Sequence, residues 1–356
     1  MAVINTNITS MIGQNNLNKS QNDLSTAMER LSSGLRINSA KDDAAGQAIA
    51  NRMTSQVTGL SQASRNANDG ISLAQTTEGA LDQINDNLQR VRELTVQAQN
   101  GTNSDSDLSS IQDEIDARLN EIDRVSAQTD FNGTKVLDGS KTSIAIQVGA
   151  DDNQTISISL QKMDSASLGL GSFDVSNLAK SVSAGGLNDG NGTAAADATF
   201  DFTNNGSGST DGLTVLKGKD DAYYVQTSDG KTYSAAVATV TDDDATVGVT
   251  FDDTTEIDAA TASAAGLSPL ADLDSALSSV DGMRSDLGAV QNRFESAIDN
   301  LSTTSTNISA AKSRIEDADY AVEVSNMTRA QILQQAGTSV LAQANQVPQG
   351  VLSLLQ

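Results

Sequence analysis

A seven-residue repeat runs through residues 268–322, which read SPLADLDSALSSVDGMRSDLGAVQNRFESAIDNLSTTSTNISAAKSRIEDADYAV. Its apolar positions are Leu273, Val280, Leu287, Phe294, Leu301, Ile308, Ile315 and Val322. The positions three residues after each are mostly small or apolar: Ala276, Met283, Val290, Ala297, Thr304, Ala311 and Ala318. This spacing places one apolar stripe along a helix and is typical of a coiled-coil helix that packs against a partner.

The sequence also marks where this helix begins. Ser268 is of a type that caps helix N-termini, and Pro269 suits the first helical position, where its missing N–H costs no hydrogen bond. About 50 residues at ~1.5 Å each predict a rod of about 75 Å, far longer than an ordinary globular helix.

Three more helical segments precede it. Near the N-terminus, apolar residues with coiled-coil spacing are Leu17, Leu24, Met28, Leu31 and Leu35. A second segment runs from Met53 to Ala98 and stops at Asn100-Gly101, and a third carries the apolar positions Leu108, Ile111, Ile115, Leu119, Ile122 and Val125. We expect each segment to be a helix with one buried face.

The apolar period then changes from 3.5 to 2, which predicts strands. Ile144, Ile146 and Val148 are expected to face Ile156, Ile158 and Leu160 across a β-hairpin. Residues 176–268 are rich in Gly, Asn, Asp, Ser and Thr, with strand-like runs at 199–202, 213–216, 223–226, 235–240 and 245–251. The predicted fold class is α+β, mainly α, with long terminal coiled-coil helices, a β-hairpin and a small inserted β domain.

The amino-acid composition excludes several classes of function. The chain has 356 residues with no Cys and no His, which removes the commonest metal ligands and the usual general base. Its net charge of −24 opposes binding to nucleic acid or to anionic membranes. We therefore expect no catalytic residues, no metal, no cofactor, no nucleic-acid partner and no membrane partner.

Charge is also partitioned along the chain. Residues 176–268 hold 14 acidic and 4 basic side chains, whereas residues 1–40 and 317–356 are together nearly neutral. The near-neutral ends carry stripes of modest apolar residues that bury too little area alone to offset chain entropy of ~1–2 kcal/mol per residue. We expect the ends to need partners and the acidic middle to face water.

Both ends carry long motifs that resemble bacterial flagellin. They read AVINTN at 2–7, LSSGLRINSAKDDAAG at 31–46, RIEDADYA at 314–321 and AQANQVPQ at 342–349. The resemblance covers about residues 1–175 and 269–356. Gly350 and the terminal Gln356 depart from the residues found in many members, and residues 176–268 correspond to the family's variable region.

The resemblance implies a structural subunit that polymerises into the flagellar filament for swimming motility. It implies type III export, a secreted, extracellular location in the bacterial flagellum, and an export chaperone, cap proteins and hook-junction proteins as partners. It implies terminal helices of the inner core at 1–40 and 317–356, outer-core helices and hairpin at 41–175 and 269–316, and a surface-exposed β domain at 176–268.

Two sets of site residues follow from the same resemblance. The predicted polymerisation helices carry Leu17, Leu24, Met28, Leu31, Leu35, Ile308, Ile315, Val322, Val351, Leu352, Leu354 and Leu355. The surface that a vertebrate Toll-like receptor recognises corresponds to Leu88, Gln89, Arg90, Val91, Leu94, Gln97 and Glu114, with core packing as the main expected role of Leu88 and Val91. The family also implies capture of the C-terminal tail by cytosolic innate sensors.

The helical pattern is also compatible with two other non-enzymatic functions. A hook-filament junction protein shares a similar helical logic, and a coiled-coil surface adhesin is a further non-enzymatic alternative. Some flagellins carry a zinc protease in the variable region, but that activity requires His-Glu-x-x-His and this chain has no His.

Overall fold

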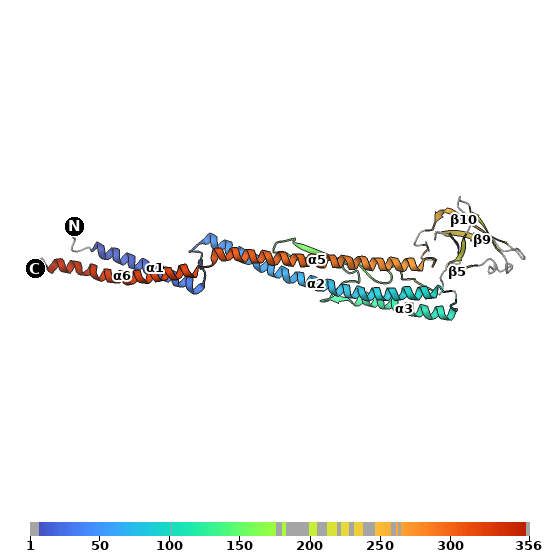
Figure 1. The fold of residues 1–356 in the computed structure, drawn as a ribbon, viewed down its shortest axis with the longest axis horizontal. Helices are drawn as coiled ribbons and strands as arrows, with labels where there is room; N and C mark the ends of the chain where they lie inside the picture. Colours follow the sequence, from blue (N-terminus) through green and yellow to red (C-terminus); the bar gives the residue numbers. More distant parts are fainter. Residues whose placement is uncertain are drawn as a thin grey trace. The chain divides into compact units, whose positions relative to one another are not determined.

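The computed structural model describes residues 7–100, 102–175, 180–182, 199–204, 212–218, 222–227, 231–237, 246–257, 261–262 and 265–353. Its helices are α1 (Ile8–Ser33), α2 (Ala44–Ala98), α3 (Asp105–Gln128), α5 (Pro269–Glu316) and α6 (Tyr320–Ser353) (Figure 1). The chain divides into two compact units, one of residues 1–68, 147–155 and 295–356 and the other of residues 69–146 and 156–294. Long helices and a small β region confirm the predicted fold class.

In the first unit, α1 and α6 lie side by side and antiparallel (Figure 1). At one end, Asn7 Nδ2 donates to the carbonyl of Ala344 at 2.8 Å. At the other end, Arg30 Nη1 lies 3.4 Å from Glu323 Oε1. The first part of α2 packs on the last part of α5 through a cluster of Leu60, Ala63, Leu301 and Ile308.

The second unit is built on the rest of α2, α3 and the first part of α5. The heptad positions of α5 here are all buried, as are the facing stripes of α2 and α3: Leu81, Ile84, Leu88, Ile115, Ile122, Leu273, Val280, Leu287 and Phe294. Polar pairs fix α2 antiparallel to α5, with Arg92 Nε 2.8 Å from Asp274 Oδ1 and Arg284 Nη2 2.6 Å from Asp82 Oδ1. The predicted stripe from Leu273 to Leu301 is therefore confirmed as core.

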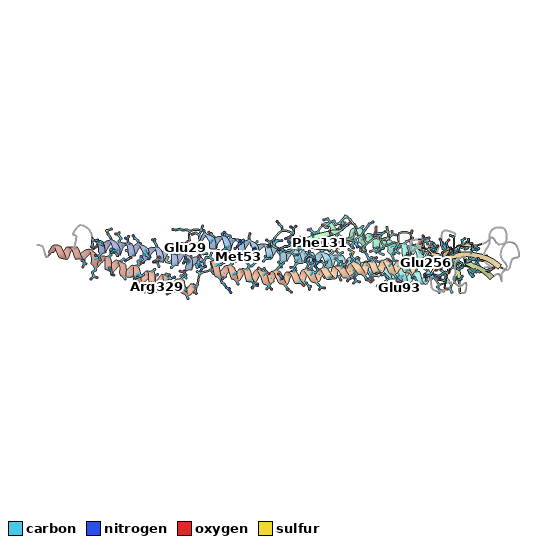
Figure 2. The ribbon with its side chains drawn as sticks, turned by 90° about the horizontal axis from the view of Figure 1, so that it is seen from above. Glu29, Met53, Glu93, Phe131, Glu256 and Arg329 are labelled. Carbon is cyan, nitrogen blue, oxygen red and sulfur yellow. The ribbon has the colours of Figure 1, made fainter. Side chains whose placement is uncertain are left out.

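Two short hairpins follow α3. Strands β1 (Asp130–Phe131) and β2 (Thr134–Lys135) pair antiparallel across Asn132 and Gly133, which both have positive φ, as a two-residue hairpin turn requires. Strands β3 (Ser143–Gln147) and β4 (Thr155–Ser159) form the predicted hairpin. Figure 2 labels Phe131 on β1.

The inserted domain is a six-stranded sheet in the order β5-β7-β8-β9-β10-β6. Its strands are β5 (Lys180–Ser181), β6 (Thr199–Asn204), β7 (Thr214–Lys217), β8 (Tyr223–Gln226), β9 (Thr232–Val237) and β10 (Thr246–Glu256). Three of the predicted runs overlap their strands closely. Strand β9 begins three residues earlier than predicted and β10 ends five residues later, while predicted positions 238–240 and 245 lie outside the described residues. Strand β5 was not predicted, and neither was the parallel pairing of β6 with β10.

One predicted helical position, Leu35, was wrong, and Val322 lies in a different helix from the rest of its heptad stripe, as the division at 316/317 implied. Leu35 lies beyond the end of α1, because Gly34 adopts a left-handed conformation and its N–H closes the helix on the carbonyl of Arg30 at 2.9 Å. Val322 is not an extension of α5, because α5 ends at Glu316 and Val322 sits exposed in α6. In both cases the coiled-coil spacing continues through a point where the helix stops.

Candidate functional site

Exposed large apolar side chains gather on α1 and α6. The described part of the chain has eleven of them, and nine lie on these two helices: Ile8, Met11, Ile12, Met28, Tyr320, Val322, Ile332, Leu333 and Val340. The other two, Ile49 and Val96, are on α2. Figure 2 shows side chains projecting from both helices, with Glu29 labelled on α1 and Arg329 on α6.

The contact between α1 and α6 explains this exposure, because the two helices approach through small residues. A Cβ added at Gly13 would lie 3.3 Å from Leu341, and one added at Gly337 would lie 3.4 Å from Leu17. The fully buried residues of the pair are small or polar, namely Ser20, Ala27, Glu323, Ala330 and Ala344. Nine of the larger apolar side chains are left exposed, whereas a self-sufficient helical hairpin would bury most of them.

The predicted polymerisation residues that the structure describes are half-buried or exposed, and they lie on α1, α5 and α6 and in the segment after α1. Leu17, Leu24, Leu31, Leu35, Ile308 and Ile315 are half-buried, while Met28 and Val322 are exposed. The side chains of Val351 and Leu352, and all of Leu354 and Leu355, lie outside the described residues. The predicted stripes did not include Ile8, Met11, Ile12, Ile332, Leu333 and Val340. All but Ile332 lie off the register of the stripes, and Ile332 lies beyond Val322, the last position of the predicted stripe.

The predicted receptor surface separates into two groups. Leu88, Val91 and Leu94 are buried in the second unit, so they act there as core residues. Gln89, Arg90 and Gln97 are exposed and Glu114 is half-exposed.

Arg90 organises the exposed group. Its Nε lies 2.9 Å from Glu114 Oε1 and its Nη1 lies 3.0 Å from Glu93 Oε2 (Glu93 is labelled in Figure 2). The hydrogen bond to Glu114, with that to Glu93, raises the pKa of Arg90. The exposed part of the predicted receptor surface, which we call the ridge, is therefore a set of polar side chains that includes the ion pairs of Arg90, and the buried Leu88, Val91 and Leu94 lie in the core.

Among the described residues, no group of His, Cys, Asp or Glu side chains has an arrangement that could hold a metal ion. The described helices include none that is both long enough and apolar enough to span a membrane.

Long helices with uncovered apolar faces at both chain ends define a coiled-coil subunit that polymerises. The family model of the bacterial flagellin N-terminal helical region matches residues 4–142, and that of the C-terminal helical region matches residues 270–355. Flagellin of Serratia marcescens is 58% identical over 361 residues, which cover 99% of each chain. Flagellin 1 of Proteus mirabilis is 56% identical and flagellin of Xenorhabdus nematophila 55% identical, each over 99% or more of both chains.

The chain belongs to the bacterial flagellin family. It is a structural subunit of the flagellar filament.

Proposed function

We propose that α1 and α6 make the contacts that hold subunits together in the filament. The observation that carries this proposal is the set of nine exposed large apolar side chains on these two helices. The same proposal keeps residues 1–40 and 317–356 as the inner core, 41–175 and 269–316 as the outer core, and 176–268 on the filament surface.

The free energy available from burying these side chains supports a role of α1 and α6 in subunit contacts. Burying a Val, Leu, Ile or Met side chain completely contributes about 1.5–3 kcal/mol. The nine side chains are each at least half exposed in the single chain, so each has about 1 kcal/mol still to gain from a neighbour. The sum is of the order needed to offset the entropy of ordering subunits in a polymer.

A matched pair of substitutions tests the proposal. Val340 on α6 is 54% exposed and Val96 on α2 is 50% exposed, so the two differ in location and hardly in environment. Val340→Ser should raise the critical concentration for polymerisation about fivefold, the equivalent of about 1 kcal/mol. Val96→Ser should leave the critical concentration unchanged. Equal effects of the two substitutions in sedimentation assays would contradict the assignment of the contacts to α1 and α6.

The same exposed helices support the proposed export chaperone, cap and hook-junction partners. Before assembly, an uncovered apolar face on α6 is a ready substrate for an export chaperone, and export through the flagellar type III channel gives the secreted location. Cap and hook-junction proteins are the partners at the two ends of a filament. Co-purification of the full chain with its chaperone, with α6 protected from amide exchange in the complex, is the expected result; unprotected α6 would exclude this helix as the binding site.

A second candidate function is recognition of the free subunit by a vertebrate Toll-like receptor. The supporting observation is the exposed ridge of Gln89, Arg90, Gln97 and Glu114. Arg90→Ala should weaken receptor binding by tenfold or more, the expected size for an interface arginine. Arg124→Ala removes a similar exposed ion pair, with Glu121, and should have no effect. Equal binding by the two variants would remove Arg90 from the surface.

A further inference from the structure

The local sequence signal for the break between α5 and α6 is Asp319, a residue type that caps helix N-termini. Residues 317–319 are Asp-Ala-Asp, with neither the proline nor the glycine that usually ends a helix. The apolar spacing from Ile315 to Val322 continues through them. Local preference therefore still permits one helix across this point, and the interruption needs a second source.

That source is the segment 34–36, which lies against the end of α5. In an uninterrupted helix, the carbonyls of Ile315 and Glu316 would accept from the amides four residues further on. In the structure, Arg36 Nη2 donates to the Ile315 carbonyl at 2.5 Å, and the Arg36 N–H donates to the Glu316 carbonyl at 2.6 Å. The helix end is closed by a part of the chain some 280 positions away.

Most hydrogen bonds that a continuous helix would make at the break are replaced by other hydrogen bonds in the structure. The Ala318 N–H, which a continuous helix would direct to Arg314, donates instead to the Gly34 carbonyl at 2.9 Å. Asp319 Oδ1 accepts from the amides of Ala321 at 2.9 Å and Val322 at 3.3 Å, and so caps α6. Most of the hydrogen bonds lost by breaking the helix are therefore replaced, so their loss does not by itself favour the continuous form.

We propose that the α5–α6 junction is a two-state element controlled by residues 34–36. When that segment is docked, α5 ends at Glu316 and α6 starts at Tyr320. When it is undocked, the helix of α5 continues through Ala318 and Asp319 to at least Val322. Residues 34–36 follow directly on α1, so the break couples the ordering of α1 to the start of α6.

The state of the free subunit rests on the proposed function: if α1 makes its contacts with neighbouring subunits, we expect the first 40 or so residues to become ordered only on polymerisation. The free subunit is then the continuous form and the filament subunit is the broken form. The two-state behaviour of the α5–α6 junction is tested in the free chain alone. Its failure can therefore be distinguished from a failure of the proposed function.

Substitutions at Tyr320 separate the two forms. Tyr320 is the first residue of α6, where proline is favoured, whereas proline in the middle of a continuous helix disfavours it by a factor on the order of 100. Tyr320→Pro should therefore lock the broken form. Tyr320→Ala is the matched control, because it removes the same 72% exposed side chain and allows both forms.

The readout is the ¹³Cα chemical shift of Ala318 and Asp319 in the full-length chain. We expect helical shifts in the free parent and in Tyr320→Ala, and non-helical shifts in free Tyr320→Pro and in parent filaments. Tyr320→Pro should also polymerise at a lower critical concentration than Tyr320→Ala. Non-helical shifts in free Tyr320→Ala, or unchanged helical shifts in filaments, would overturn the two-state element. A parent chain that forms no filaments would instead overturn the proposed function, leaving the free-chain comparison valid.

Discussion

Gly70 on α2 packs closely against the ring of Phe294 on α5, and changing Gly70 to alanine tests how that core is packed. Phe294 is fully buried, and a Cβ added at Gly70 would lie 2.7 Å from its Cζ. Alanine in place of a helical glycine normally stabilises by about 1 kcal/mol. A contact this short forces the ring to move within a closed core, which costs about 1–3 kcal/mol. We therefore expect Gly70→Ala to destabilise by about 1 kcal/mol.

Two variants give the controls. Gly79 lies on the same helix with no atom within 4 Å of an added Cβ, so Gly79→Ala should stabilise by about 1 kcal/mol. In the background Phe294→Leu the ring is gone, and Gly70→Ala should change from destabilising to neutral or stabilising. The assay is urea unfolding of the free subunit followed by circular dichroism. A stabilising Gly70→Ala in the parent chain would refute the packing argument.

Three further predictions concern the carboxyl group of Asp164, the response of filaments to acid, and the inserted domain. Burial raises the pKa of Asp164, but hydrogen bonds from Lys162 and Ser167 outweigh it and lower the pKa to about 2. Because the pKa of Asp164 is lower in the folded state, its ionised carboxylate stabilises the fold at pH values above the unfolded-state pKa of about 3.8. This contribution, at most about 2 kcal/mol, is lost as the pH falls towards 2. Asp164→Asn should therefore lower stability at pH 7 and flatten its loss between pH 4 and 2 in thermal melts. With no His, filaments should keep their length from about pH 5 to 8 and dissolve only in stronger acid, so light scattering that falls near pH 6.5 would contradict this. Replacing residues 176–268 by a short flexible linker should still give filaments, thinner and with less salt-dependent bundling; a folded variant that never sediments as polymer would place that domain in the assembly contact.

The sequence was sufficient for the helices that bury a regular stripe. From Leu273 to Leu301 the heptad positions of α5 face a partner helix in the same chain, and the start at Pro269 agrees with the structure. Beyond Leu301 the same spacing continues, but Ile308 and Ile315 are only half-buried. Periodicity shows that a face is apolar, and it does not show which molecule covers that face.

The misses have a common physical cause, which is contact between segments distant in sequence. The end of α5 depends on hydrogen bonds from residues 34–36. The parallel pairing of β6 with β10 joins strands about 47 positions apart, and local strand preference carries no information on such a partner. Off-register residues such as Leu333 and Val340 are exposed because α1 and α6 contact each other through small residues, which periodicity along one helix cannot predict.

Amide hydrogen exchange of the free subunit and the filament tests the central claim most directly, because it compares α1 and α6 with the second unit in one chain. In the free subunit we expect amides of α1 and α6 to exchange far faster than those around Phe294 and Leu81, since the terminal pair buries few large apolar side chains of its own. In the filament the two groups should be protected alike. Terminal helices that exchange as slowly in the free subunit as the second unit does would show that α1 and α6 need no neighbours, and would contradict the account.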